Sequence, residues 1–126
     1  MLKNKSSSAI VAVRDIDRAR TFYGDTLGLE LADAGMGDLL VYRTGATQLI
    51  VYKSEFAGTN QANAAVWDCG DEIDEIVADL KAKGVTFEHF PDLEGVTIEG
   101  DVHVADDAKL VWLKDPDGNI LHLISM

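Results

Sequence analysis

Few side chains in this sequence could carry out proton-transfer or ligand chemistry near neutral pH. The three histidines are His89, His103 and His122. His122 alternates with Leu121 and Leu123 in an apolar segment, so its imidazole should occupy one face of a strand and the two leucines the other. There it could act as a general acid or base toward a bound molecule, or be satisfied by a neighbouring protein group. No partner carboxylate can be named from the sequence.

Other signatures of catalysis are missing. The sequence contains no Gly-rich phosphate loop, no Cys/His pairs at zinc spacing and no serine in a nucleophile elbow. Cys69 lies in an apolar run beside Trp67, which is typical of a buried structural cysteine. As the only cysteine it permits no internal disulfide, which favours a reducing cytoplasm. We expect His89 at the surface and His103 in a solvent-exposed loop, with a lid over a cavity as the alternative for His103.

Composition limits the possible partners. The chain of 126 residues is 47% apolar, which predicts one globular domain over residues 1–126. Its net charge is −11 and its 11 basic residues are scattered, which argues against binding of nucleic acid. No segment approaches the ~18 consecutive apolar residues of a membrane-spanning helix, so we expect no membrane association.

The elements that would position His122 come from a sequence that repeats itself. Asp15 and Asp71 each stand between an apolar run and a helical pattern, and they are 56 residues apart. Gly28 and Gly84, which end the two helical patterns, have the same separation. Two copies of one unit bury their hydrophobic faces by pairing, and this leaves a seam or cavity where a ligand can bind.

Each copy is predicted to form a β-α-β-β-β unit. Asp15 or Asp17 caps the first helix and Asp71 the second. The predicted strands of the first copy are 9–13, 29–32, 39–43 and 48–53, and those of the second are 64–69, 85–87, 109–114 and 120–124. The second copy carries about 16 extra residues, placed between 90 and 107, with an edge strand at 102–104. The first module then covers about 7–54, a polar linker about 55–63, and the second module about 64–126.

Two stretches carry a family resemblance. Residues 14–29 (RDIDRARTFYGDTLGL) and 112–124 (WLKDPDGNILHLI) resemble the opening and closing signatures of the vicinal oxygen chelate superfamily, which includes glyoxalase I, bleomycin resistance proteins and extradiol dioxygenases. The resemblance implies an α+β fold of two βαβββ modules in a pseudo-two-fold arrangement, whose mixed sheets curl around a central cavity.

Catalytic members of that superfamily hold a divalent metal with four side chains in the cavity. The four matching positions in this chain are Ser8, Ile50, Ala64 and His122. Alanine and isoleucine have no donor atom, and a neutral serine hydroxyl is a poor ligand for transition metals. One imidazole does not hold zinc or iron by itself. We therefore expect no metal and no other cofactor.

The remaining cavity residues follow from strand alternation. Tyr52 has the same parity as Ile50 and should face the cavity, and Phe56 lies in the linker, which often borders the pocket in this superfamily. Trp67 has the opposite phase to Ala64 and should pack beneath a helix. The candidate ligand-binding residues are Ser8, Ile50, Tyr52, Phe56, Ala64 and His122, with His122 as the candidate catalytic residue.

Three functions are compatible with this pattern. The leading one is metal-independent binding of a small organic or cationic compound, similar to the sequestration by bleomycin resistance proteins. The alternative is a glyoxalase-, isomerase- or dioxygenase-like enzyme, of lyase or isomerase type, with an altered site that uses His122. The third is a dimeric structural or regulatory protein without a ligand. The resemblance also implies a homodimer, with modules that pair within one chain or swap between two.

Overall fold

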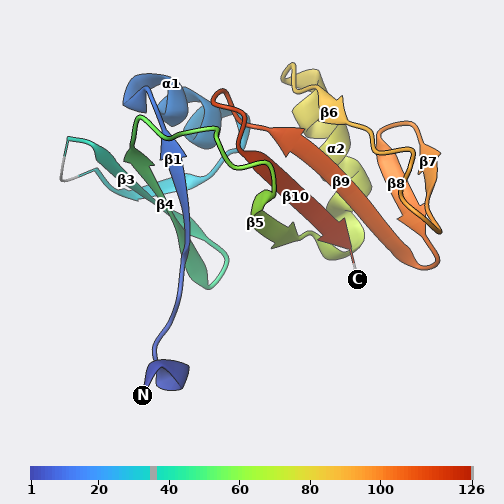
Figure 1. Ribbon diagram of the computed structural model, residues 1–126, viewed down its shortest axis with the longest axis horizontal. Coiled ribbons are helices and arrows are strands. Elements are labelled where there is room, and N and C mark those ends of the chain that lie inside the picture. Colours follow the sequence, from blue (N-terminus) through green and yellow to red (C-terminus); the bar gives the residue numbers. More distant parts are fainter. Residues whose placement is uncertain (35–36, 126) are drawn as a thin grey trace.

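The protein is an α+β structure with two mixed sheets (Figure 1). The computed structural model describes residues 1–34 and 37–125. The first sheet has the order β1-β4-β3-β2, in which β1 and β4 are parallel and the other neighbours antiparallel. Its strands are β1 (Ala9–Val13), β2 (Glu30–Asp33), β3 (Leu39–Thr44) and β4 (Thr47–Lys53).

The second sheet repeats this arrangement and extends it. Its order is β5-β10-β9-β8-β7, with β5 and β10 parallel, and β6 pairs with the same edge of β9 as β8 does. Its strands are β5 (Asn63–Asp68), β6 (Phe87–Glu88), β7 (Thr97–Glu99), β8 (Val102–Ala105), β9 (Ala108–Lys114) and β10 (Ile120–Ser125). The predicted strand at 102–104 is confirmed as β8. However, it lies inside the sheet, because the unpredicted strand β7 covers its outer edge.

The first helix begins as predicted. After the short 3₁₀ turn η1 (Leu2–Asn4) and β1, α1 (Ile16–Arg20) continues directly into the π-helical η2 (Thr21–Thr26). The Asp15 carboxylate accepts a hydrogen bond from the Arg18 amide at 3.1 Å and so caps α1. Gly28 follows with φ of 74°, the left-handed conformation expected at a helix end.

The second helix begins differently from the prediction. Asp71 lies inside a 3₁₀ turn, η3 (Gly70–Glu72), and α2 (Ile73–Ala82) starts after it without a side-chain cap. The turn is instead set by Asp68, whose carboxylate accepts a hydrogen bond from the Gly70 amide at 3.1 Å. Gly70 has φ of 53°, which glycine adopts without steric cost, and the chain therefore bends before Asp71.

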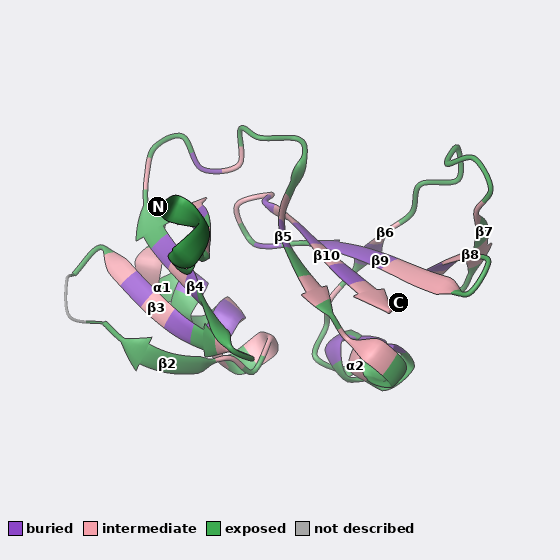
Figure 2. Cartoon of the chain, turned by 90° about the horizontal axis from the view of Figure 1, so that it is seen from below, coloured by how far each residue is buried: buried purple, intermediate pink, exposed green. Residues whose placement is uncertain are grey.

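The core lies between each sheet and its helix. Figure 2 shows buried stripes along β3, β4, β9 and β10, whereas β2 is exposed throughout. Buried side chains alternate along β3, β4 and β10. Among the largest buried side chains of the strands and helices are Tyr23, Leu40, Tyr42, Leu49, Ile73, Leu113 and Leu121. The opposite face is open to solvent along β1 and β5, as Ile10 (56% exposed) and Val66 (57% exposed) show, whereas Trp112 of β9 is buried on it. We call this opposite face the outer face.

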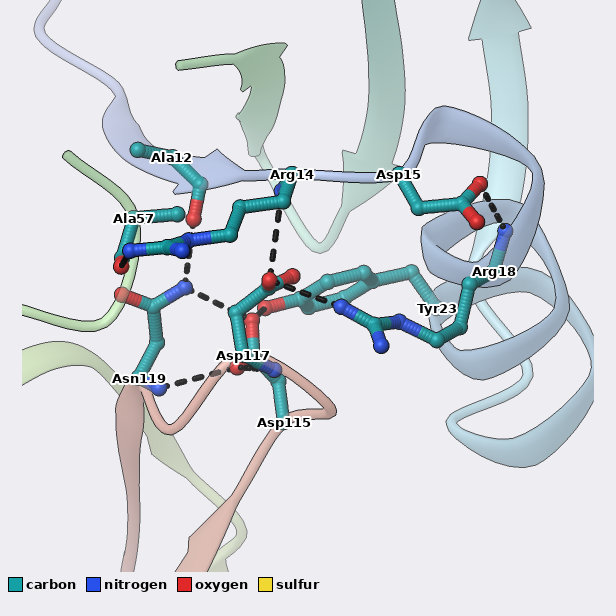
Figure 3. A network of polar contacts seen from close by, with 9 residues as sticks. All are labelled: Ala12, Arg14, Asp15, Arg18, Tyr23, Ala57, Asp115, Asp117 and Asn119. Carbon is teal, nitrogen blue, oxygen red and sulfur yellow. Dashed lines mark hydrogen bonds and ion pairs between the residues drawn. The ribbon is translucent and has the colours of Figure 1, made fainter. Parts of the chain in front are cut away.

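The turn between β9 and β10 fastens the second module to the first. Between β9 and β10, the buried Asp115 carboxylate accepts four hydrogen bonds of 2.7–2.9 Å (Figure 3). One comes from the Tyr23 hydroxyl of η2, and the others come from Asp117 and Asn119 within the turn. Asn119 also donates to the Ala12 carbonyl of β1 at 2.7 Å. The turn is thereby bonded to both the first helix and the first sheet.

Two further contacts complete this junction. The Asp117 carboxylate accepts hydrogen bonds from the Arg14 amide at 3.2 Å and from the Arg18 guanidinium at 2.8 Å. The linker reaches the same turn at Gly58, where an added Cβ would lie 1.9 Å from the Asp117 carbonyl oxygen. Within the described residues the two sheets meet at β1 and β5 but do not close into a barrel.

The Tyr23–Asp115 hydrogen bond should make a large contribution to stability. We expect Tyr23→Phe to lower the free energy of unfolding by about 2 kcal/mol, because a buried carboxylate loses a donor and water cannot replace it. The matched control is Tyr42→Phe, since the buried Tyr42 hydroxyl has no hydrogen-bond partner in the described part of the chain. Urea unfolding of both variants tests this. Equal losses in the two would contradict it.

Candidate functional site

The predicted site residues are divided between the outer faces of the two sheets. Ile10 and Ile50 pair across β1 and β4, and Tyr52 follows on the same face of β4. On the second sheet, Val66 of β5 pairs with His122 of β10, and Ala64 lies two residues before Val66. Because β1 and β5 are in contact, these two largely apolar sets lie on either side of one seam.

A pocket of about 250 Å³ occupies the seam between the sheets, at β1, the linker and β5. Three of the predicted residues, Tyr52, Phe56 and Ala64, lie along it. Its complete lining is Ile10, Val11, Ala12, Tyr52, Phe56, Gly58, Asn60, Asn63, Ala64 and Asn119. The lining contains apolar and aromatic side chains with several amides but no charged group, which suits a small and mostly apolar ligand.

The other predicted residues do not reach the seam pocket. Ser8 lines a separate hollow at the far end of the first sheet, together with Arg43 and Gln48. Ile50 is half-buried, and His122 lies one strand away from β5, opposite Val66. The structure therefore places Tyr52, Phe56 and Ala64 together and keeps Ser8 apart from them.

His122 has a defined environment. Its ring stacks on Trp112, the residue paired with it on β9, with centroids 4.4 Å apart and planes inclined by 13°. Its Nδ1 lies 2.9 Å from the Val111 carbonyl oxygen, which can only accept, so Nδ1 carries a proton. Burial lowers the pKa of His122 below its usual range. At neutral pH the ring is therefore uncharged, and Nε2 can accept a hydrogen bond from a ligand.

The inserted segment, about 90–107, packs against Trp112 from the edge of β9 that faces away from β10. His103 of β8 and Phe90 both make edge-on contacts with Trp112, at centroid distances of 4.9 and 5.1 Å. The prediction of an exposed His103 is wrong, because the side chain is 0% exposed. Its Nε2 accepts a hydrogen bond from the Phe90 amide at 2.9 Å, which holds the segment before β7 against the sheet. The pairing of β8 with β9 causes this burial, and the sequence carried no signal of that pairing.

The positions that correspond to metal ligands in the related superfamily offer few donors. Ile50 and Ala64 present only hydrocarbon, and Ser8 and His122 offer one hydroxyl and one imidazole. Among the described residues, no three His, Cys, Asp or Glu side chains cluster as a metal site would require. Two such donors on separate sheets do not fit a divalent metal, which takes at least three protein ligands in catalytic zinc sites.

Trp67 is on the opposite side of the second sheet from His122. It packs against the hydrophobic core, as strand alternation predicts, and its indole Nε1 donates to the Thr44 hydroxyl at 2.8 Å.

In the described chain, no helix has both the length and the apolar character needed to cross a membrane.

Known proteins are similar to this chain in sequence pattern and in fold. The model of the Glyoxalase/Bleomycin resistance protein/Dioxygenase superfamily matches residues 6–123. A glyoxalase/bleomycin resistance protein/dioxygenase from Alicyclobacillus acidocaldarius has a similar structure, with a TM-score of 0.71 and 23% identity over 97% of this chain and 91% of that one. None of the curated protein sequences matches this chain.

Two further structures, of proteins named for a particular activity, share the fold at lower sequence identity to this chain. A lactoylglutathione lyase from Agrobacterium tumefaciens has a TM-score of 0.70 and 19% identity, over 97% of this chain and 93% of that one. A fosfomycin resistance protein from Listeria monocytogenes has a TM-score of 0.70 and 13% identity, over 98% and 93%. At these identities the similarity is one of fold.

The buried His103 should make stability depend on pH. Burial, and secondarily the charges of His89 and His122, lower the pKa of His103. The folded protein therefore takes up this proton less readily than the unfolded chain, whose histidine pKa is about 6.5. Stability should be full above that value and should decrease as the pH falls below it.

Urea unfolding between pH 7.5 and 5 tests this prediction with His103→Gln. Glutamine does not titrate, and its side-chain oxygen can still accept the Phe90 hydrogen bond. The variant should lose less stability on acidification than the parent, although His122 contributes a remaining slope in the same direction. Identical slopes in variant and parent would show that His103 does not titrate on unfolding.

Proposed function

Since this chain belongs to the Glyoxalase/Bleomycin resistance protein/Dioxygenase superfamily, we propose that it is a metal-independent member that binds a small organic molecule on its outer face. The observation that carries the proposal is the set of contacts that hold the His122 imidazole. Its half-buried imidazole is held by Trp112 and the Val111 carbonyl, and none of the other positions equivalent to metal ligands provides a second strong donor.

The chemistry around His122 suggests the kind of ligand. The seam residues Tyr52 and Phe56 provide aromatic surface, and neutral Nε2 of His122 provides one acceptor. An aromatic compound with a hydrogen-bond donor, such as a phenol or an aromatic amine, would use both. The net charge of −11 also favours a cationic compound over an anionic one.

A homodimer is part of this proposal. Apolar residues exposed on the outer face include Ile10, Tyr52 and Val66, and Phe56 at the seam is 78% exposed. Soluble proteins seldom leave such an apolar surface open unless a partner or ligand covers it. A second copy placed over this face would enclose His122 and the seam pocket. We also place the protein in the cytoplasm, in keeping with its single cysteine.

Ligand affinity should depend on His122 and on pH. In calorimetric titration with a panel of phenols and aromatic amines, we expect at least one compound to bind more tightly than about 1 mM, which corresponds to about −4 kcal/mol. Its affinity should fall several-fold on acidification, with a midpoint below the ordinary histidine pKa of about 6.5, because burial lowers the pKa of His122 and the acceptor Nε2 is lost only when the ring gains a proton. His122→Leu should bind weakly and show no such pH dependence.

The matched control is His89→Leu, which removes a histidine from an exposed position and should keep the parent's pH profile. If His122→Leu binds like the parent at every pH, the site moves to Tyr52 and Phe56.

The alternative function is an enzyme of lyase or isomerase type with an altered site, and it predicts a different metal content. Protein purified without chelator would then contain about one Zn, Ni, Mn or Fe ion per chain, whereas the proposed binding protein contains none.

Assembly can be tested independently of any ligand. Sedimentation at micromolar concentration should give twice the chain mass of 13.7 kDa. Val66→Glu should give the single-chain mass and keep its secondary structure, because it places a charge on an exposed position of the outer face. Ala78→Glu makes the same charge change on the exposed side of α2 and should remain dimeric. A parent protein that sediments at 13.7 kDa would remove the dimer from the proposal.

A further inference from the structure

A second hollow lies on the opposite side of the second sheet, between α2 and the end of η2. We call it the helix-side groove, and its volume is about 480 Å³. Leu113, Leu121 and Leu123 of β9 and β10 line it from the sheet, while Leu27 and Ile76 line it from the helices. This volume lies within the usual range for small-molecule sites.

One end of the groove is acidic. Trp67, Asp68 and Cys69 follow one another at the end of β5, and Glu72 comes next along η3. Neither Asp68 nor Glu72 forms an ion pair with any described residue. Burial raises the pKa of the Cys69 thiol, and the charges of Asp68 and Glu72 raise it further. The end of the groove at Cys69 therefore has a negative potential.

The other end is electrically balanced. Asp79 lies about two turns further along α2 and forms an ion pair with Lys83 at 3.2 Å. Lys83 also donates to the Thr26 carbonyl at 3.3 Å, which joins α2 to η2 beside Leu27. No lysine, arginine or histidine is among the described residues that line the groove. A ligand therefore meets hydrocarbon along the groove and unpaired negative charge at one end.

The indole of Trp67 adds a specific contact at the acidic end. Its Nε1 donates to the Thr44 hydroxyl of β3 at 2.8 Å, which fixes the orientation of the ring. An aromatic face beside carboxylates is a favourable site for an alkylated ammonium group, which is attracted to both. The geometry and charge of this pocket differ from those of the outer face, where the available group is a neutral imidazole.

From these observations we propose that the helix-side groove binds a small amphipathic organic cation, with its ammonium group at Trp67 and Glu72 and its apolar chain toward Leu27. This site does not depend on the proposed function, because it lies on the other side of the second sheet from His122. It would remain if the outer face bound no ligand at all.

Octyltrimethylammonium is a suitable probe, with octanol and octane sulfonate as neutral and anionic controls. Calorimetric titration of the full chain should give a submillimolar dissociation constant for the cation, at least tenfold weaker binding of octanol and no measurable binding of the sulfonate. In Trp112→Phe the only remaining indole is Trp67, so its emission should change over the same concentration range. Heat of binding without a change in Trp67 emission would place the cation elsewhere and overturn the proposal.

Glu72→Gln should weaken cation binding three- to tenfold without changing the binding of octanol. The matched control is Glu75→Gln, which makes the same charge change on an exposed position of α2 that does not line the groove. Equal weakening in both variants would indicate a general effect of net charge and would overturn the proposed site. If the affinity for octyltrimethylammonium instead fell as the protein concentration rose, a second copy of the chain would be competing for the groove. That copy would then be its occupant, and the proposal would also be wrong.

Discussion

The arrangement of the two modules depends on one buried carboxylate. Asp115 receives donors from its own turn and from Tyr23, and Asn119 carries the connection on to β1. A carboxylate removed from water is stable only when its oxygens are hydrogen-bonded, so the turn must stay against the first module. That docking brings β1 next to β5, and the seam pocket follows from it.

The two sides of the second sheet have different chemistry. On the outer face, His122 stacks on Trp112, and partial burial lowers its pKa so that the ring is uncharged at neutral pH. On the helix side, the chain end of β5 collects carboxylates beside Trp67 and raises the thiol pKa of Cys69. Along β10 alternation separates the two sides, because His122 points to the outer face while Leu121 and Leu123 line the helix-side groove. The two sides of this sheet therefore present different chemical groups.

The sequence predicted the elements where the signal is local and failed where partners are distant. Asp15 caps its helix because the carboxylate reaches an amide only three residues away. Asp71 was misassigned because Asp68 and Gly70 bend the chain first. Tyr52, Phe56 and Ala64 line one pocket in keeping with strand parity and family resemblance. The burial of His103 depends on how β8 pairs with β9, and no local pattern in the segment specifies that register.

The separation of Tyr23 and Asp115 along the chain has a consequence for synthesis. The two residues are 92 positions apart, so the first helix and sheet emerge from the ribosome well before the turn that satisfies the tyrosine hydroxyl. During that interval the hydroxyl, the Arg18 guanidinium and the edge strand β1 have no intramolecular partner from the second module. The five-residue turn arrives late in synthesis and supplies the partners of the Tyr23 hydroxyl and the Arg18 guanidinium.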